Sequence, residues 1–193
     1  MNPMRTRMAL AALITAFLTL GALPGAPARA AEFKYDFEGC QQGWEAKKGS
    51  NWTHGSTAVP SSNPTSVIKN FHYQTDQSRG DALVSKPHDW AGGKGVIKLR
   101  ARWLFEWYPD ESLTLDRAVL EMSSDGGKTW KARQGFRVPQ PEFTNISVPF
   151  DAPAGQFLLR FVVFSDTSVE LYGIEIDDIT MPTAAPAGTS CKK

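Results

Sequence analysis

Hydrophobic and polar residues alternate over the middle and the second half of the chain. In residues 97–107, one side of an extended strand would carry Ile97, Leu99, Ala101, Trp103, Phe105 and Trp107, and the other side is mostly charged. A period of two predicts a strand with one packed face and one face in water. Runs rich in β-branched and aromatic residues predict further strands at 117–123, 143–148, 157–164 and 172–181.

Turn signals separate these runs, at 108–110, 125–127, 138–141 and 151–155. Residues 53–82 are rich in Ser, Thr, Asn and Gly, which predicts long loops around one short strand at 66–73. A single all-β domain has to bury the inner faces of its sheets. We therefore expect an all-β fold over residues 31–181, a two-sheet antiparallel jelly-roll β-sandwich, with an immunoglobulin-like sandwich as the alternative.

The first thirty residues have the pattern of an export signal. Arg5 and Arg7 precede an apolar run, and Ala28-Arg29-Ala30 supplies small residues for cleavage. The apolar run is shorter than the roughly 20 residues that a membrane-spanning helix needs, so a retained anchor is the less favoured alternative. We expect residues 1–30 to be a cleaved secretory signal peptide, the mature protein to be secreted or periplasmic without a membrane span, and residues 182–193 to form a flexible C-terminal tail.

Charge excludes one class of partner. The chain has 21 basic and 20 acidic residues, and removal of residues 1–30 takes away three arginines and no acid. The mature chain is then slightly acidic, which gives no electrostatic reason to expect nucleic acid as a partner.

Two cysteines, Cys40 and Cys191, lie near the two ends of the mature chain. In an oxidising compartment an even number of cysteines favours a disulfide between them. The alternative is that Cys191 lies unpaired in a frayed end.

Residues 123–130 form the most specific local motif, Ser-x-Asp-x-Gly-x-Thr-Trp, known as an Asp box. We expect it to hold a hairpin turn in which Asp125 accepts hydrogen bonds from backbone amides and Trp130 folds back as an apolar plug.

Several short motifs in a fixed order carry a resemblance. They are Phe37-Glu38-Gly39, Gly43-Trp44, Leu83-Val84-Ser85-Lys86-Pro87, the motif at 123–130, and Ile176-Asp177-Asp178-Ile179. Over residues 33–181 the chain resembles the jelly-roll modules that include MAM domains, reelin-type repeats and accessory domains of immune-inhibitor-A-type metallopeptidases. The closing strand is also similar to that of jelly-roll carbohydrate-binding modules. The cysteine pattern of MAM domains is missing.

This resemblance implies a non-catalytic module that binds an extracellular glycan or protein. It also implies that the first and last strands are neighbours, which would bring Asp36 and Glu38 close to Asp177 and Asp178. Such a group of carboxylates could bind a structural Ca²⁺. The alternative is that one of the last two caps backbone amides while the other is solvated.

Exposed aromatic side chains are the candidate ligand contacts, because sugar rings stack on them. Trp107 and Tyr108 are the first candidates, and Trp52 and Trp90, flanked by polar loop residues, are the others. Trp103 and Phe105 are expected in the core.

Catalysis is not expected. Retaining β-glucanases of the concanavalin-like jelly-roll fold carry Glu-x-Asp-x-x-Glu, but Thr180 stands here where the last carboxylate would be. His54, His72 and His88 lack metal-ligand spacing and are predicted to be solvated loop residues. A structural or accessory component of an exported complex is the second hypothesis for function, and a jelly-roll glycoside hydrolase is the least favoured.

Overall fold

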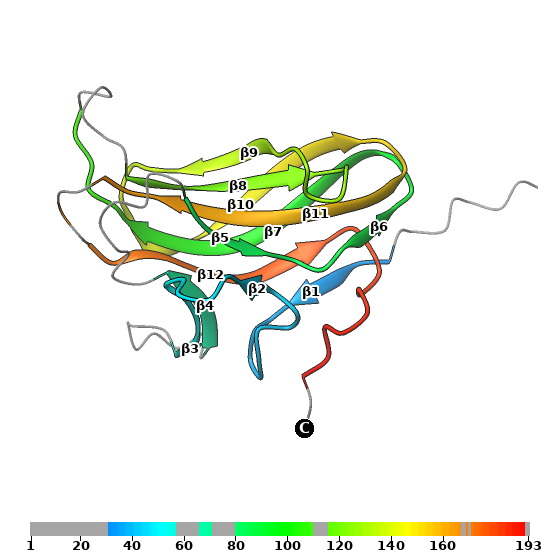
Figure 1. Ribbon diagram of the computed structural model, residues 1–193, viewed down its shortest axis with the longest axis horizontal. Helices are drawn as coiled ribbons and strands as arrows, with labels where there is room; N and C mark the ends of the chain where they lie inside the picture. The colour runs from blue at the N-terminus through cyan, green and yellow to red at the C-terminus, as the bar shows by residue number, and fades with distance from the viewer. Residues whose placement is uncertain are drawn as a thin grey trace, which may run out of the picture.

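The computed structural model describes residues 31–56, 66–70, 80–109, 116–166, 169 and 171–191. Residues 1–30, where the signal peptide is predicted, and His72 lie outside these ranges. The described strands form two antiparallel sheets packed face to face (Figure 1). Within the described ranges there is no helix long and apolar enough to cross a membrane.

The first sheet has the strand order β10-β7-β12-β4-β3, and β1 pairs with the second half of β12. Its strands are β1 (Phe33–Tyr35), β3 (Trp52–Ser56), β4 (Ser66–Asn70), β7 (Gly93–Leu104), β10 (Gln140–Ala152) and β12 (Gly173–Met181). The predicted neighbourhood of the first and last strands is therefore confirmed, with Tyr35 opposite Ile179.

The second sheet has the order β2-β5-β11-β8-β9, and β6 pairs with the start of β11. Its strands are β2 (Glu45–Ala46), β5 (Asp81–Val84), β6 (His88–Trp90), β8 (Arg117–Ser123), β9 (Lys131–Phe136) and β11 (Gly155–Phe164). The predicted all-β sandwich of two antiparallel sheets is confirmed.

The core lies between β7 and β12 on one side and β8 and β11 on the other. Alternate residues of each strand are buried, for example Ile97, Leu99 and Ala101 on β7 and Leu159 and Phe161 on β11. This is the period of two that the sequence predicts. Each large apolar side chain buried in this way contributes roughly 1.5–3 kcal/mol to stability.

A β-bulge interrupts the alternation on β12. Asp177 is opposite Arg100 and Thr180 is opposite Lys98, so β12 carries one extra residue here, and Asp178 has a positive φ of 52°. Because of this extra residue, Ile176 and Ile179 both point into the core although they are three positions apart.

His88 corrects one prediction: it is fully buried, not a solvated loop residue. Its Nε2 is 3.0 Å from the Tyr35 hydroxyl, its Nδ1 is 3.1 Å from Thr183 Oγ1, and its ring stacks on Phe157. Burial lowers the pKa of His88 to about 4, so the imidazole is neutral at physiological pH. His54 is half-buried, with Nε2 2.6 Å from the carbonyl oxygen of Phe37.

The segment after β12 is anchored, whereas the sequence predicts a flexible tail. Thr183 and Thr189 are buried, and Cys191 forms a disulfide with Cys40, with their Cα atoms 5.6 Å apart. The disulfide is therefore formed, and residues 182–191 do not have the freedom expected from their Ala, Pro and Gly content. The physical reason is that Thr183 hydrogen-bonds a buried histidine, which composition does not show.

Asp81 joins the two sheets. Its carboxylate accepts hydrogen bonds from Ser50 Oγ at 2.6 Å, from Asn51 N at 2.9 Å and from Asn70 Nδ2 at 2.8 Å. Asp81 starts β5 in the second sheet, whereas Asn70 ends β4 in the first. Because a buried carboxylate needs hydrogen-bond donors and this one has three, these bonds fix one edge of the sandwich.

The segment between β8 and β9 is the predicted hairpin turn. Asp125 Oδ1 accepts hydrogen bonds from the backbone amides of Lys128 at 3.0 Å and Thr129 at 2.9 Å. These bonds hold the pKa of Asp125 well below its usual range, with the Thr129 hydroxyl making the largest contribution. Trp130 Nε1 donates back to the carbonyl oxygen of Gly127 at 3.0 Å, which closes the turn.

Candidate functional site

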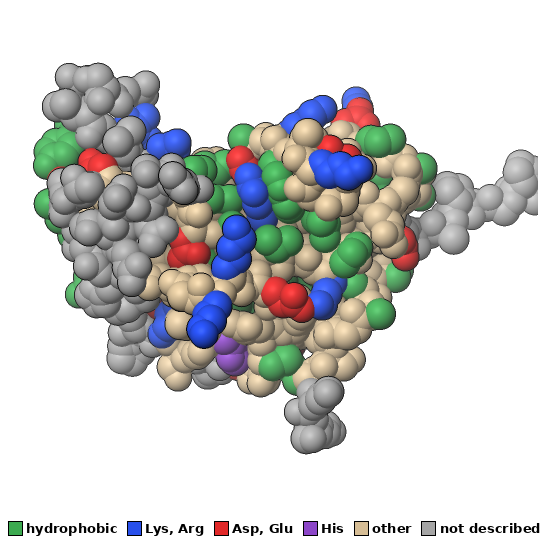
Figure 2. All heavy atoms as spheres, viewed as in Figure 1, with side chains coloured by type: hydrophobic (Ala, Val, Ile, Leu, Met, Phe, Trp, Pro, Cys, Tyr) green, Lys and Arg blue, Asp and Glu red, His purple; other side chains and the backbone are tan. Residues whose placement is uncertain are grey.

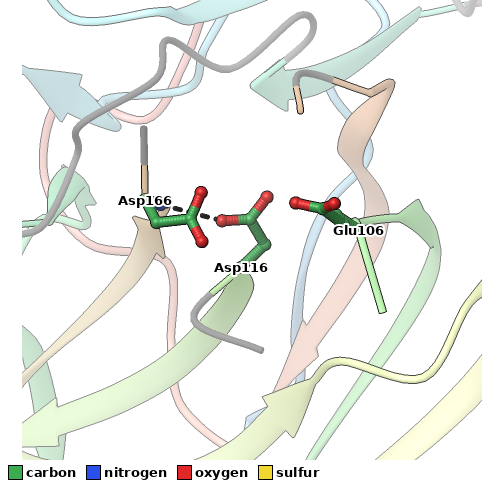
Figure 3. A group of neighbouring side chains, drawn as sticks. All are labelled: Glu106, Asp116 and Asp166. Carbon is green, nitrogen blue, oxygen red and sulfur yellow. Dashed lines mark hydrogen bonds between the residues drawn. The ribbon is translucent and has the colours of Figure 1, made fainter. Parts of the chain in front are cut away.

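Three carboxylates meet at one end of the sandwich. Glu106 follows the end of β7, Asp116 precedes β8 and Asp166 follows β11. Phe164 pairs with Arg117, so the last two segments leave the second sheet side by side, while Glu106 comes from the first sheet. Figure 3 shows the three side chains pointing toward one another from these separate segments. The fold therefore brings together acids that are far apart in sequence.

The geometry suits a cation. One carboxylate oxygen from each residue lies within 4.8 Å of the others, and within the described ranges this is the one such group of His, Cys, Asp or Glu side chains. Asp116 is only 1 % exposed, and its Oδ1 accepts a hydrogen bond from the backbone amide of Asp166 at 2.9 Å. Like charges this close repel one another, whereas hard cations bind several carboxylate oxygens at once. The acidic triad, meaning Glu106, Asp116 and Asp166, could hold a metal ion.

Exposed aromatic side chains lie directly beside the acidic triad. Trp107 is 39 % and Tyr108 is 45 % exposed, as the sequence predicts for these two residues. The Tyr108 hydroxyl donates a hydrogen bond to Glu106 Oε1 at 2.6 Å. This bond, together with the negative charges of Glu106 and Asp166, raises the pKa of Tyr108 above its usual value. Tyr108 therefore interacts with two of the three acids, with Glu106 through a hydrogen bond and with Asp166 through its charge.

Other exposed hydrophobic side chains gather at the same end, which we call the loop end. Trp103 Nε1, near the end of β7, donates to the carbonyl oxygen of Val138, and Tyr172 precedes Gly173, which pairs with Leu104. Among the described residues, the large hydrophobic side chains that are more than a third exposed are Trp107, Tyr108, Val138, Val169, Tyr172 and, away from the loop end, Val96. Acidic groups and exposed rings thus share one surface.

Comparisons with known proteins find the same fold in solved structures. No family model and no curated protein matches the chain. Among solved structures, the K3 cleaved adhesin domain of Lys-gingipain from Porphyromonas gingivalis superposes with a TM-score of 0.55 at 18 % identity, covering 78 % of this chain and 96 % of that domain. The CBM22-1 xylan-binding domain of Xyn10C from Paenibacillus barcinonensis superposes with a TM-score of 0.51 at 12 % identity, covering 79 % and 95 %.

The fold is a jelly-roll β-sandwich. The K2 adhesin domain of Lys-gingipain agrees, with a TM-score of 0.51 at 18 % identity over 78 % of this chain and 97 % of that domain. At such low identity the likeness establishes the architecture alone. Adhesin domains and a xylan-binding domain share this jelly roll, so the residues of this chain have to carry the functional argument.

Two of the four predicted ligand contacts do not offer a free ring. Trp52 is only 5 % exposed, and its Nε1 donates to the backbone carbonyl of Asp81 at 2.9 Å. Trp90 is half-buried and packs against Phe150 and Phe157, with ring centroids 5.0 and 6.4 Å apart. Trp52 lies in β3 and Trp90 in β6, two strands that the sequence does not predict. For this reason their polar neighbours indicate exposed loop positions in the sequence.

The predicted metal ligands at the β1–β12 junction lie on neighbouring segments of the chain, but their carboxylates do not form a tight cluster. Asp178 forms a salt bridge with Lys34 at 2.6 Å and lies 3.8 Å from Arg100. Asp36 Oδ1 accepts a hydrogen bond from the backbone amide of Glu38 at 3.3 Å. These acids do not meet the 4.8 Å spacing that the acidic triad meets. A metal site formed by Asp36, Glu38, Asp177 and Asp178 stays a prediction.

Asp177 is the residue of this junction that lacks a full set of partners. It is 2 % exposed, and its Oδ1 has no hydrogen-bond partner among the described residues. Burial raises the pKa of Asp177 to about 7, and the negative charges of Asp178 and Glu38 add to the effect. A buried carboxyl group of this kind is stable either as the neutral acid or with a cation beside it.

Glu175, on the same strand, is engaged elsewhere. It is 3 % exposed, and its Oε2 is 2.5 Å from both Nε and Nη2 of Arg102. The carboxylate is thus held in a buried ion pair on β12, and it does not stand free in a cleft as a glycosidase nucleophile does.

Proposed function

We propose that this chain is an exported, non-catalytic module that binds an extracellular glycan at the loop end. The observation that carries the proposal is the exposure of Trp107 and Tyr108 immediately beside the acidic triad. A sugar ring can stack on an exposed indole or phenol, and its hydroxyl groups can bind carboxylates or a cation held by them. The fold supports this proposal, because a xylan-binding domain has the same architecture.

Export is supported by the disulfide. A bond between Cys40 and Cys191 is stable in oxidising compartments, which favours a secreted or periplasmic protein. The resemblance to MAM domains, reelin-type repeats and immune-inhibitor-A-type accessory domains implies the same kind of role and stays a prediction.

The alternative ligand is a protein surface, which the likeness to adhesin domains supports. A purely structural role would need a continuous apolar face well beyond the roughly 300–600 Å² of ordinary monomers. The described part of the face shown in Figure 2 instead mixes basic, acidic and hydrophobic side chains. Binding through a small site is therefore the favoured function.

A glycan array probed with the mature protein, once with calcium and once with chelator, tests the proposal. Trp107→Ala is expected to weaken binding at least about fivefold, because a stacked ring contributes roughly 1 kcal/mol or more. Lys128→Ala, an exposed change in the β8–β9 turn, is the matched control and should bind as wild type. Absence of binding to every glycan in both conditions would refute the glycan ligand and leave the protein ligand as the proposal.

Calcium is proposed at the acidic triad and, as the sequence predicts, at the β1–β12 junction. Carboxylate oxygens are the ligands that calcium prefers, and Asp177 offers a buried oxygen without a donor. Calcium should raise the melting temperature relative to chelator. Glu106→Gln should remove the part of the shift that comes from the triad, and Asp177→Asn the part that comes from the junction. An unchanged melting temperature of the wild type would exclude both sites.

A further inference from the structure

A hollow lies on the sandwich away from the loop end. It is an open hollow of about 530 Å³ between the start of β7, the end of β10 and one side chain of β9. That volume is within the range of roughly 300–1,000 Å³ in which small ligands bind. The lining side chains that matter are Lys94, Val96, Arg133, Pro149, Phe150 and Asp151.

Apolar surface makes up part of this hollow. Val96 is 42 % exposed, although it lies within a long strand. Pro149 stands opposite Val96 on β10 and is also exposed. The two side chains belong to neighbouring strands and face solvent together. They provide a small hydrophobic surface on which one face of a ring can rest.

Arg133 supplies a cation that forms no salt bridge with any residue that the structure describes. It is half-buried at the β-bulge of β9, where β8 and β9 change register. Its Nη2 lies 3.8 Å from the sulfur of Met122, and its buried Nε has no hydrogen-bond partner among the described residues. A guanidinium group donates five hydrogen bonds and pairs best with a carboxylate. Among the described residues, the buried Nε of Arg133 has no such acceptor.

Nearby acids do not fill this role. Glu121, on the strand next to β9, forms a salt bridge with Arg160 at 2.5 Å. Asp151 lies opposite Lys94 on the neighbouring strand. The lining therefore has two basic side chains, Lys94 and Arg133, and one acidic side chain, Asp151, which leaves a net positive charge. A ligand that completes the hollow would bring its own carboxylate.

We propose that this hollow binds a uronic acid residue of an acidic glycan. The carboxylate would pair with Arg133, the ring would rest on Val96 and Pro149, and the hydroxyl groups would reach Lys94 and Asp151. The proposal rests on the glycan-binding function proposed above and names a second site with its own substrate class. A ring with a carboxylate fits this hollow because the lining combines an apolar surface with a guanidinium group that has no salt bridge to a described residue.

Calorimetric titration of the mature protein tests this site. The probes are trimers of galacturonic acid and of glucuronic acid, each compared with its methyl ester, which has the same rings without the charges. At least one acid trimer is expected to bind, and its ester at least about tenfold more weakly, because a charge-assisted hydrogen-bonded pair is lost. Arg133→Gln should weaken binding of the acid to the same extent, and Lys94→Gln to a smaller extent.

Two controls separate this site from the loop end. Lys131→Gln changes an exposed cation on the same strand outside the hollow and should bind the acid trimer as wild type. Trp107→Ala should also leave it unchanged. If Trp107→Ala abolishes binding while Arg133→Gln does not, the second site is refuted and the loop-end function stands. Equal binding of acid and ester, or binding of neither, likewise overturns the second site. Melting temperatures show whether Arg133→Gln is folded. If this variant does not fold, the comparison of acid with ester and the Lys94→Gln variant still test the site.

Discussion

Replacement of His88 by Gln probes how the second sheet is joined to the two ends of the domain. The imidazole is fully buried and joins Tyr35 of the first strand to Thr183 beyond the last strand. Gln keeps a polar side chain able to hydrogen-bond but does not titrate. The difference in unfolding free energy between wild type and His88→Gln therefore isolates the protonation of one residue.

The magnitude follows from the two pKa values of His88. In the unfolded chain the pKa is near 6.5, and burial lowers it to about 4 in the folded protein. Above pH 6.5 the side chain is neutral in both states, and its contribution to stability is fully present. As the pH falls toward 4, the unfolded chain takes up a proton that the folded protein does not, and stability is lost. Between pH 7 and pH 4.5 the loss amounts to roughly 2.5 kcal/mol.

Urea unfolding at pH 7, 6, 5 and 4.5, in chelator and at constant ionic strength, measures this loss. The wild type should be the more stable protein at pH 7, because Gln removes the ring contacts with Tyr35 and Phe157. Its advantage over His88→Gln should shrink by roughly 2.5 kcal/mol on going to pH 4.5. A difference that stays constant over this range would refute a buried, neutral His88.

Three further changes test other parts of the fold. Asp81→Ala should lower the unfolding free energy by about 3–5 kcal/mol, because one buried and two half-buried donors lose their acceptor. Urea unfolding measures the loss, with the exposed Asp151→Ala as control, and a loss below about 1 kcal/mol would contradict the account. Cys40→Ser combined with Cys191→Ser should lower stability by up to about 5 kcal/mol, since the bond spans 151 residues; reduced wild type should match the double variant. For Asp177, whose folded pKa is raised, stability is present below about pH 4 and lost as the pH rises to 7. In chelator, Asp177→Asn should remove that loss, and an unchanged pH profile would show that the carboxyl group is not buried as an acid.

The sequence predicts the strands whose hydrophobic and polar residues alternate within one segment. Residues 117–123 were predicted as a strand and form β8 with the same bounds, because Ala118, Leu120 and Met122 alternate with polar or half-exposed neighbours. The strand predicted at 97–107 ends at Leu104 instead. Alternation continues past that point in Phe105, which is buried, but the sequence does not show where the strand loses its hydrogen-bonded partner.

The candidate site was readable only in part. The exposure of Trp107 and Tyr108 can be predicted, because both residues lie next to Pro109 near the end of a strand, and both rings are exposed; their contact with a ligand stays a prediction. The acidic triad was missed, since Glu106, Asp116 and Asp166 lie in three segments that only the tertiary structure joins. The signal that could have suggested it is an acid at the boundary of each of three predicted strands. Trp52 and His88 were misread because their partners, Asp81, Tyr35 and Thr183, are distant in sequence.

Mapping of a bound neutral oligosaccharide on the ¹⁵N-labelled mature protein tests the central claim most directly. The neutral glycan that gives the strongest signal on the array is titrated into the protein, and changes in amide chemical shift are followed residue by residue. The loop-end account predicts that the largest changes occur at Glu106, Trp107 and Tyr108 and at the indole of Trp107. Changes confined to the outer faces of the two sheets, with these residues unaffected, would contradict it.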